Sequence, residues 1–300
     1  MDYVPSPDQK ATLEVVESLL GRQAGPARAR ELRDRHDDTL LAALEQAGFL
    51  DLALDPNAGP LDAALVTEAA ARALAAVHVG ARALVAPQVL DGPVPPRIAL
   101  ADAANPGPIR FGTDADVVLV LDGPDVRVVE PAEAERVETG YVLPYARVDL
   151  SGGRVLPGAG PRMAAWWRVA LAAEVAGLLD AALSLTSEYL AQRTQFNRPL
   201  GSLQALQHRL AEAYVWVEGV RWSARSAAWH GDAESAATAA TYATMAAREV
   251  AVDMHQLSGA IGFTEEYDLH LWTMRAQALR TELGGIGGHA GAVTALRWAG

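Results

Sequence analysis

Apolar residues recur every three or four positions through the first 86 residues, the spacing that places them on one face of a helix. Two such stripes are formed by Leu13, Val16, Leu19 and Leu20, and by Leu40, Leu41, Leu44 and Phe49. The turn-rich segment 55–60 follows, and a third apolar pattern runs from there to about Leu84. Residues 1–86 are therefore predicted to form an N-terminal helical domain.

The pattern changes at Pro87. Short β-branched runs at 117–121, 126–129 and 147–150 stand among recurring Pro and Gly residues, which is typical of strands. The dipeptides Asp122-Gly123 and Gly152-Gly153 lie between these runs and indicate hairpin turns. We therefore expect residues 87–158 to form a small antiparallel β domain.

Long helical patterns return after a Pro- and Gly-rich linker. They cover roughly 162–193, 203–230, 233–260 and 265–283, with Ala where helices would approach closely. Short connections between long helices predict an antiparallel four-helix bundle. The predicted bundle domain covers residues 159–300 and includes, after its last helix, a flexible glycine-rich tail at 284–288. The predicted fold class is α+β, mostly α: a helical domain, a reduced β domain and a four-helix bundle.

Composition narrows the class of protein. Half of the residues are hydrophobic, yet no apolar run approaches the roughly 20 residues that a membrane-spanning helix needs. The formal net charge of -12 argues against nucleic acid or an anionic membrane as the main partner. The chain has no cysteine, which excludes disulfides and thiolate chemistry and favours a reducing, cytoplasmic location. The first residues show no secretory signal.

Two motifs in the bundle carry candidate binding chemistry. The first is Arg193-Thr194-Gln195-Phe196, with Gln204 eleven residues after the arginine. The second runs from Gln256 to Tyr267 and contains Gly259 and Gly262. Each has a purely structural interpretation as well. Arg and Phe suit a helix C-terminus, and a glycine suits a helix cap followed by a turn.

Together, the two motifs and the order of the three regions resemble the acyl-CoA dehydrogenase family of flavoproteins. The motif resemblance covers about residues 160–285, whereas the first 160 residues match in architecture alone and are short for the family. The resemblance implies that the chain contacts the ADP half of an FAD seated on a neighbouring subunit. The implied contacts are Arg193, Gln195, Phe196, Gln204, Gln256 and Gly259. Arginine suits this task because its fork binds phosphate oxygens in pairs.

The resemblance also implies a catalytic carboxylate, and the sequence lacks one at both family positions. These positions fall on Gly284, after the last bundle helix, and on Trp167, in the first. The nearest acids are Glu282 and Glu174, which we expect to be solvated on their Ala-rich helices. The family segments that hold the flavin ring are absent from 87–158, and no metal site is predicted. No catalytic residue is therefore predicted.

The leading hypothesis is a non-catalytic subunit of a heteromeric acyl-CoA dehydrogenase. The implied assembly is α2β2, with FAD shared with a full-length homologous partner that supplies the base and binds most of the acyl-CoA substrate. The resemblance also implies a substrate derived from a steroid side chain, because several family members that form α2β2 assemblies belong to steroid side-chain degradation. One alternative is a self-sufficient dehydrogenase that uses Glu282 or Glu174 as its base. Another is a flavin-free scaffolding protein that keeps the bundle for oligomerisation.

Overall fold

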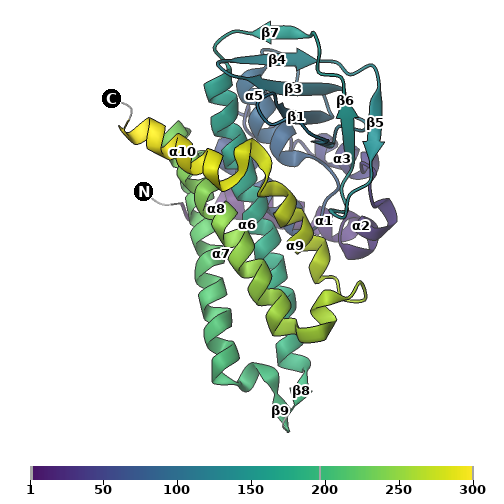
Figure 1. Cartoon of the computed structure of the whole chain (residues 1–300), viewed down its shortest axis with the longest axis vertical. Coiled ribbons are helices and arrows are strands. Elements are labelled where there is room, and N and C mark those ends of the chain that lie inside the picture. The colour runs from purple at the N-terminus through teal and green to yellow at the C-terminus, as the bar shows by residue number, and fades with distance from the viewer. Residues whose placement is uncertain (1–2, 196, 299–300) are drawn as a thin grey trace.

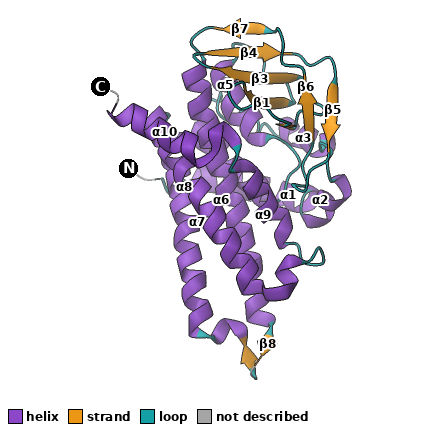
Figure 2. Cartoon of the chain, in the orientation of Figure 1, coloured by secondary structure: helices purple, strands orange, loops and turns teal. Residues whose placement is uncertain are grey.

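The computed structural model describes residues 3–195 and 197–298. Helices form most of the molecule, and two small sheets lie beside one end of a long helical bundle (Figure 2). The N-terminal helices pack behind the sheets and against the upper half of the bundle (Figure 1). This order confirms the predicted fold class. The division at residues 86/87 and 158/159 stays a prediction.

The N-terminal region is helical as predicted, except for a break at residues 73–78. Its elements are α1 (Pro7–Gln23), α2 (Pro26–Leu32), α3 (Asp38–Gln46), α4 (Pro60–Arg72), the π-helix η1 (Gly80–Val85) and α5 (Ala86–Val89). The predicted continuous helix to Leu84 was wrong, because α4 ends at Arg72 and Leu74 adopts a φ of 58°. Leu74 and Val79 are nevertheless buried. Apolar spacing alone did not distinguish this buried turn from a further helical turn.

The β region contains two sheets. The first is β1 (Ile98–Asp102), β3 (Val117–Asp122), β4 (Asp125–Val129) and β7 (Arg154–Leu156), in that order. The second is β2 (Ile109–Arg110), β6 (Tyr145–Val148) and β5 (Ala134–Val137). The fully antiparallel prediction was wrong for one pair, since β1 and β3 run parallel.

The two predicted hairpin turns had different outcomes. Asp122-Gly123 does join β3 to β4, which pair antiparallel. Gly152-Gly153 instead connects β6 in one sheet to β7 in the other, so it turns the chain without forming a hairpin. Gly153 has a φ of 89°, and an added Cβ would lie 2.6 Å from the Val128 carbonyl oxygen. The dipeptide thus marked a turn correctly but did not indicate which strands would pair.

The bundle consists of α6 (Gly160–Gln192), α7 (Gln204–His230), α8 (Ala233–Ser258) and α9 (Leu269–Leu279). A short hairpin, β8 (Thr194–Gln195) and β9 (Arg198–Pro199), and the 3-10 turn η2 (Leu200–Ser202) join α6 to α7. The turn η3 (Gly259–Phe263) follows α8. The most apolar 18-residue stretch of α6 is long enough to cross a membrane, but 78% of it is buried within this molecule. It is therefore the core helix of the bundle.

The predicted flexible tail was wrong. After the turn η4 (Glu282–Gly284), residues Gly285–Trp298 form α10, which packs on α8. Its glycines allow close packing: a Cβ at Gly288 would lie 2.1 Å from the Leu283 carbonyl oxygen. Low helix propensity thus coexists with a helix because tertiary contacts stabilise it.

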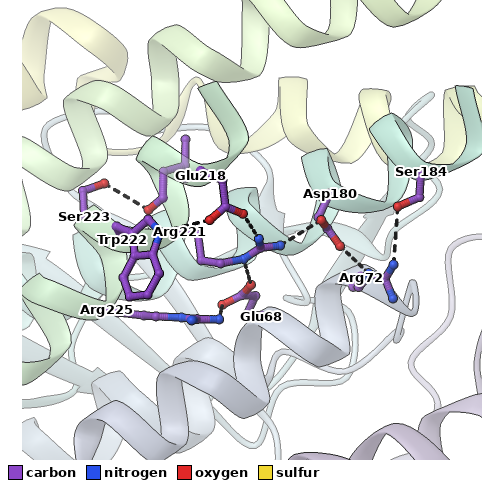
Figure 3. Close-up of polar contacts among 10 residues, drawn as sticks. Glu68, Arg72, Asp180, Ser184, Glu218, Arg221, Trp222, Ser223 and Arg225 are labelled. Atoms are coloured by element: carbon purple, nitrogen blue, oxygen red, sulfur yellow. Dashed lines mark hydrogen bonds and ion pairs between the residues drawn. The ribbon is translucent and has the colours of Figure 1, made fainter. Parts of the chain in front are cut away.

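An ion-pair network fixes α4 to the bundle (Figure 3). Arg221 of α7 binds Glu68 of α4 at 2.7 Å and Asp180 of α6 at 2.8 Å. Arg225 also reaches Glu68, at 3.2 Å, and Arg72 binds Asp180 at 2.5 Å. The helices meet so closely here that a Cβ at Gly177 of α6 would lie 2.0 Å from the Glu68 carbonyl oxygen. The N-terminal helices are therefore fixed to the bundle by both charge and backbone contact.

Candidate functional site

A buried ion cluster lies where the sheets meet the upper half of α6 and the end of α9. Arg110 of β2 is its centre, and its side chain is only 6% exposed. Its Nη1 donates to Glu174 Oε2 at 2.6 Å, and its Nε donates to Glu282 Oε1 at 2.9 Å. One guanidinium thus holds both acids that the sequence offers as alternative bases.

The prediction that these two acids are solvated was wrong. The side chains of Glu174 and Glu282 are 12% and 14% exposed. Glu174 lies against the π-helix η1, where a Cβ at Gly80 would approach its Oε1 to 2.8 Å. An Ala-rich helix does suggest an exposed acid, but here Arg110 arrives from a distant strand and compensates the buried charge.

Trp167 completes the contacts of Glu282. Its indole Nε1 donates to Glu282 Oε2 at 2.6 Å. Each oxygen of Glu282 is therefore already engaged, one by Arg110 and one by Trp167. Trp167 itself is buried. The position at which some family members carry a base thus holds a hydrogen-bond donor that anchors the nearby acid.

A cavity of about 510 Å³ opens beside this cluster. Its walls are the β1–β2 loop on one side and the α9–α10 junction on the other, with Arg110, Trp167 and Glu282 on the inner wall. Asp102 also lines it, but its carboxylate accepts from Ala104 N–H at 3.0 Å and Asn105 Nδ2 at 2.6 Å. A cavity of this size is within the range of small-molecule sites.

Burial determines the protonation of the surrounding groups. It raises the pKa of the Glu174 carboxyl, an effect that the neighbouring Arg110 opposes. It lowers the pKa of His78 well below its usual value, so this imidazole is neutral. His78 Nδ1 lies 3.1 Å from the Ile98 carbonyl oxygen, an acceptor, so Nδ1 carries the proton and Nε2 faces Glu174 Oε1 at 3.9 Å.

A second arginine balances the charge of the cluster. Arg275, on α9, is buried and donates to the carbonyl oxygens of Ala75 and Val142 at 3.1 and 3.0 Å. Burial, with the positive charge of Arg110, lowers the pKa of Arg275 to about 9. Two arginines and two glutamates thus form a neutral set. Three of them, Arg110, Glu174 and Arg275, line a small cavity of about 30 Å³.

Two residues beside the cluster have a left-handed backbone. Phe111, next to Arg110, has a φ of 61°, and Leu283, next to Glu282, has a φ of 51°. Both residues are buried, and Phe111 stacks on His78 with ring centroids 4.9 Å apart. Such conformations persist where the surroundings enforce them and often mark functional sites. One signal of this centre is visible in the sequence, a single Arg between Ile109 and Phe111, and its importance was missed.

The predicted FAD contacts lie at the opposite end of the bundle (Figure 1). Arg193 follows α6, Gln195 is in β8, Gln204 begins α7 and Gln256 is near the end of α8. All four are exposed, and none of their side chains has a hydrogen-bond or ion-pair partner in the described part of the chain. Phe196 lies outside the described residues.

The second motif forms a tight turn at the same end. Gly259 ends α8 with φ 67° and ψ -146°, a conformation that favours glycine, so the helix cap is Gly259 and not Gly262. His255 Nδ1 lies 2.7 Å from the Gly262 carbonyl oxygen, and His255 Nε2 lies 2.9 Å from Thr273 Oγ1. Tyr267 donates to the Leu185 carbonyl oxygen at 3.0 Å, which places this turn beside the last part of α6.

The two ends are too far apart to share one small molecule. Trp167 and Arg193 are 193 − 167 = 26 residues apart along α6 and its cap, or about 39 Å at 1.5 Å per residue. This exceeds the length of an extended flavin dinucleotide. The exposed donors fit the ADP half of such a cofactor, since their hydrogen-bonding groups are free to meet phosphate oxygens. They cannot hold a cofactor whose ring occupies the cavity of the same chain.

Comparison with known proteins gives consistent results. Residues 162–287 match the family model of the acyl-CoA dehydrogenase C-terminal domain. The chain is 32% identical over 291 residues to acyl-CoA dehydrogenase IpdE2 of Mycobacterium tuberculosis, covering 91% of this chain and 92% of that protein.

Solved structures share the fold. A chain of the ChsE4–ChsE5 complex from Mycobacterium tuberculosis superposes with a TM-score of 0.86 at 24% identity, covering 99% of each chain. A chain of a Tcur3481–Tcur3483 steroid ACAD variant gives 0.79 at 24% identity, covering 96% of this chain and 97% of that one. The similarity to IpdE2 extends over almost the whole of both sequences, and the fold agrees with it. The chain belongs to the acyl-CoA dehydrogenase family.

Proposed function

We propose that the chain is a subunit of a heteromeric, FAD-dependent acyl-CoA dehydrogenase in which a partner subunit performs the chemistry. The observation that carries this proposal is that both oxygens of Glu282, the acid offered as a base at the cavity, are held by Arg110 and Trp167, while Arg193 stands exposed about 39 Å away along α6. Because one dinucleotide cannot reach both, the exposed donors serve a cofactor seated in another chain. Arg193, Gln195, Phe196, Gln204, Gln256 and Gly259 would contact its ADP half.

The cavity end supports a non-catalytic role. Removing the α-proton of an acyl-CoA thioester needs a carboxylate that is free to accept it. Of the acids at the cavity, Glu282 is held by Arg110 and Trp167, and Asp102 by its own loop. Glu174 lies behind Arg110. The two family positions hold Gly284 and Trp167. When bound, FAD supplies the hydride acceptor; this chain contributes affinity and orientation.

The relatives support a heteromer of this kind. The ChsE4–ChsE5 structure is a complex of two different chains, and one of them covers 99% of this chain. The Tcur3481–Tcur3483 protein is a steroid ACAD, which supports a steroid-derived acyl-CoA as the substrate. We extend both features to this chain, with an α2β2 assembly, a full-length homologous partner, and a cytoplasmic location that suits a chain without cysteine.

The test is to tag the chain in its native cells and purify it with whatever copurifies. We expect a homologous acyl-CoA dehydrogenase in the preparation, an absorption band near 450 nm, and FAD lost from an Arg193→Ala assembly but retained in Arg162→Ala. Arg162 is an exposed arginine at the far end of α6. A colourless assembly would contradict the proposal. FAD occupancy that Arg193→Ala leaves untouched would favour the scaffolding alternative.

A second candidate is a self-sufficient dehydrogenase built from copies of this chain. The observation in its favour is that Glu282 faces a cavity of about 510 Å³. A neighbouring copy could then supply the exposed donors. This candidate requires the purified single chain to bind FAD and reduce it with an acyl-CoA, and Glu282→Gln or Glu174→Gln to abolish that reduction. Asp102→Asn, which lies in the lining of the same cavity, is the matched control.

A further inference from the structure

The β8–β9 hairpin presents an arginine that the family motif did not single out. The two strands pair antiparallel, with Gln195 opposite Arg198 and Thr194 opposite Pro199. Side chains that lie directly opposite each other in such a pair share a face of the ribbon. Arg198 therefore lies beside Gln195, one of the predicted FAD contacts.

Arg193 lies on the same face. Its backbone is extended, with φ -72° and ψ 116°, and its carbonyl oxygen accepts from the Leu200 N–H at 2.8 Å, which continues the ladder. Residues two apart along a strand point to the same side. Arg193, Gln195 and Arg198 thus form one polar face of the hairpin, which we call the arginine face, and Thr194 and Pro199 form the other.

The turn keeps this face in register. Asn197 has a φ of 60°, a left-handed conformation that Asn accepts more readily than other non-glycine residues. The turn that brings Arg198 back opposite Gln195 therefore needs no glycine. The hairpin also extends beyond the bundle at its lower tip (Figure 1), so the arginine face is accessible to another molecule.

The arginine face is also electrostatically unusual for this protein. The chain carries a net charge of -12, yet residues 193–204 contain two arginines and no acidic residue. All three side chains of the face are exposed, and none has a hydrogen-bond or ion-pair partner in the described part of the chain. By contrast, Arg209 on the neighbouring helix is paired with Asp253.

The geometry points to Arg198 as a second diphosphate-binding residue, which acts with Arg193 on the same cofactor. A diphosphate bridge carries a negative charge on each phosphate, and each guanidinium fork can engage one phosphate through paired hydrogen bonds. Gln195, between them on the face, adds an amide donor. This inference rests on the proposed function, since it assigns a further residue to the same cofactor contact.

The experiment uses the assembly purified with its partner, stripped of flavin and titrated with FAD while flavin fluorescence is followed. Arg193→Ala and Arg198→Ala are each expected to raise the Kd about 10-fold, the loss of one charge-assisted contact. Thr194→Val, on the opposite face of the same hairpin, should leave the Kd unchanged. Added salt should weaken FAD binding less in Arg198→Ala than in the unaltered assembly, because one screened charge is gone. Riboflavin, which has no diphosphate, should bind all variants alike.

The outcomes separate this inference from the proposed function. If Arg193→Ala weakens FAD binding and Arg198→Ala does not, Arg198 is no phosphate contact and only the inference fails. If neither substitution changes the Kd, or the assembly holds no FAD, the proposed function fails as well. A loss of riboflavin binding in Arg198→Ala would show a distorted hairpin and overturn the assignment.

Discussion

At the scale of single residues, Arg110 determines the state of the cavity end. It is buried and bound to both Glu174 and Glu282, and these carboxylates raise its pKa above the usual value despite the cost of burial. The sequence places the three residues far apart, at 110, 174 and 282, and only the fold brings them together. This part of the site could not be predicted, because a long-range ion pair leaves no local pattern.

Replacing Arg110 should show how much the stability of the cluster depends on the positive charge that balances Glu174 and Glu282. Arg110→Met leaves two buried carboxylates without a counter-charge, which we expect to lower the free energy of unfolding by about 3–5 kcal/mol. Urea denaturation would measure it. Adding Glu174→Leu and Glu282→Leu should restore part of the loss, because both uncompensated carboxylates are then gone and Arg275 keeps its two carbonyl acceptors. A triple variant as unstable as Arg110→Met would show that the packing of Arg110, and not its charge, matters.

His289 should make stability depend on pH. It is fully buried on α10, and burial, with nearby Arg168, lowers its pKa to about 4. The unfolded imidazole titrates near 6.5, so the unfolded state binds more protons between these values. Stability from this residue is therefore present above pH 6.5 and is lost as the pH falls towards 4, by up to about 3 kcal/mol. Denaturation of His289→Gln from pH 7 to pH 4 should show a flatter profile. If the free energy of unfolding of His289→Gln depends on pH as steeply as that of the unaltered chain, the prediction is contradicted. His208→Gln, at an exposed histidine, is the control.

At the scale of elements, periodic patterns predicted most of the helices and the strands β3, β4 and β6, but not β1, β2, β5 or β7. Failures occurred where tertiary contacts override local preference. The run at 117–120 is buried throughout, as expected of a central strand. The residues of that run do not indicate that the neighbouring strand β1 is parallel to β3. The α4 pattern broke off early, and glycine-rich α10 formed through packing on α8. Propensity alone cannot reveal a surface that an element meets only in the folded state.

The crossing of α4 and α6 gives a sharp test of such packing. A Cβ at Gly177 would lie 2.0 Å from the Glu68 carbonyl oxygen, so Gly177→Ala must push the helices apart beside the Arg221 network. We expect a loss of about 1–3 kcal/mol in the free energy of unfolding. Gly291→Ala is the matched control, since it is also helical but has open space around it. That substitution should be neutral or stabilising by up to about 1 kcal/mol. Equal effects at both sites would contradict the close contact.

At the scale of the whole molecule, α6 connects two regions that lie far apart, the buried ion cluster and the exposed donors. Its upper part carries Trp167 and Glu174 at the self-paired cluster, and its lower end carries Arg193. The motifs of the lower end could be recognised from the sequence, because their residues are close together along the chain. The pairing of Glu174 and Glu282 with Arg110 at the upper end could not be predicted from the sequence. The sequence showed only that Gly284 and Trp167 are not carboxylates.

This arrangement predicts that FAD stabilises the assembly and not the isolated chain. A ligand that binds the native state at 100 times its Kd adds about 2.7 kcal/mol of stability. Because the proposed contacts of this chain involve only half of the cofactor, the isolated chain should gain almost nothing at the same FAD concentration. Thermal unfolding of the chain alone and of the copurified assembly, each with and without FAD, would measure the difference. Equal stabilisation of both would mean that this chain binds the whole cofactor by itself, which would contradict the shared site and favour the self-sufficient dehydrogenase.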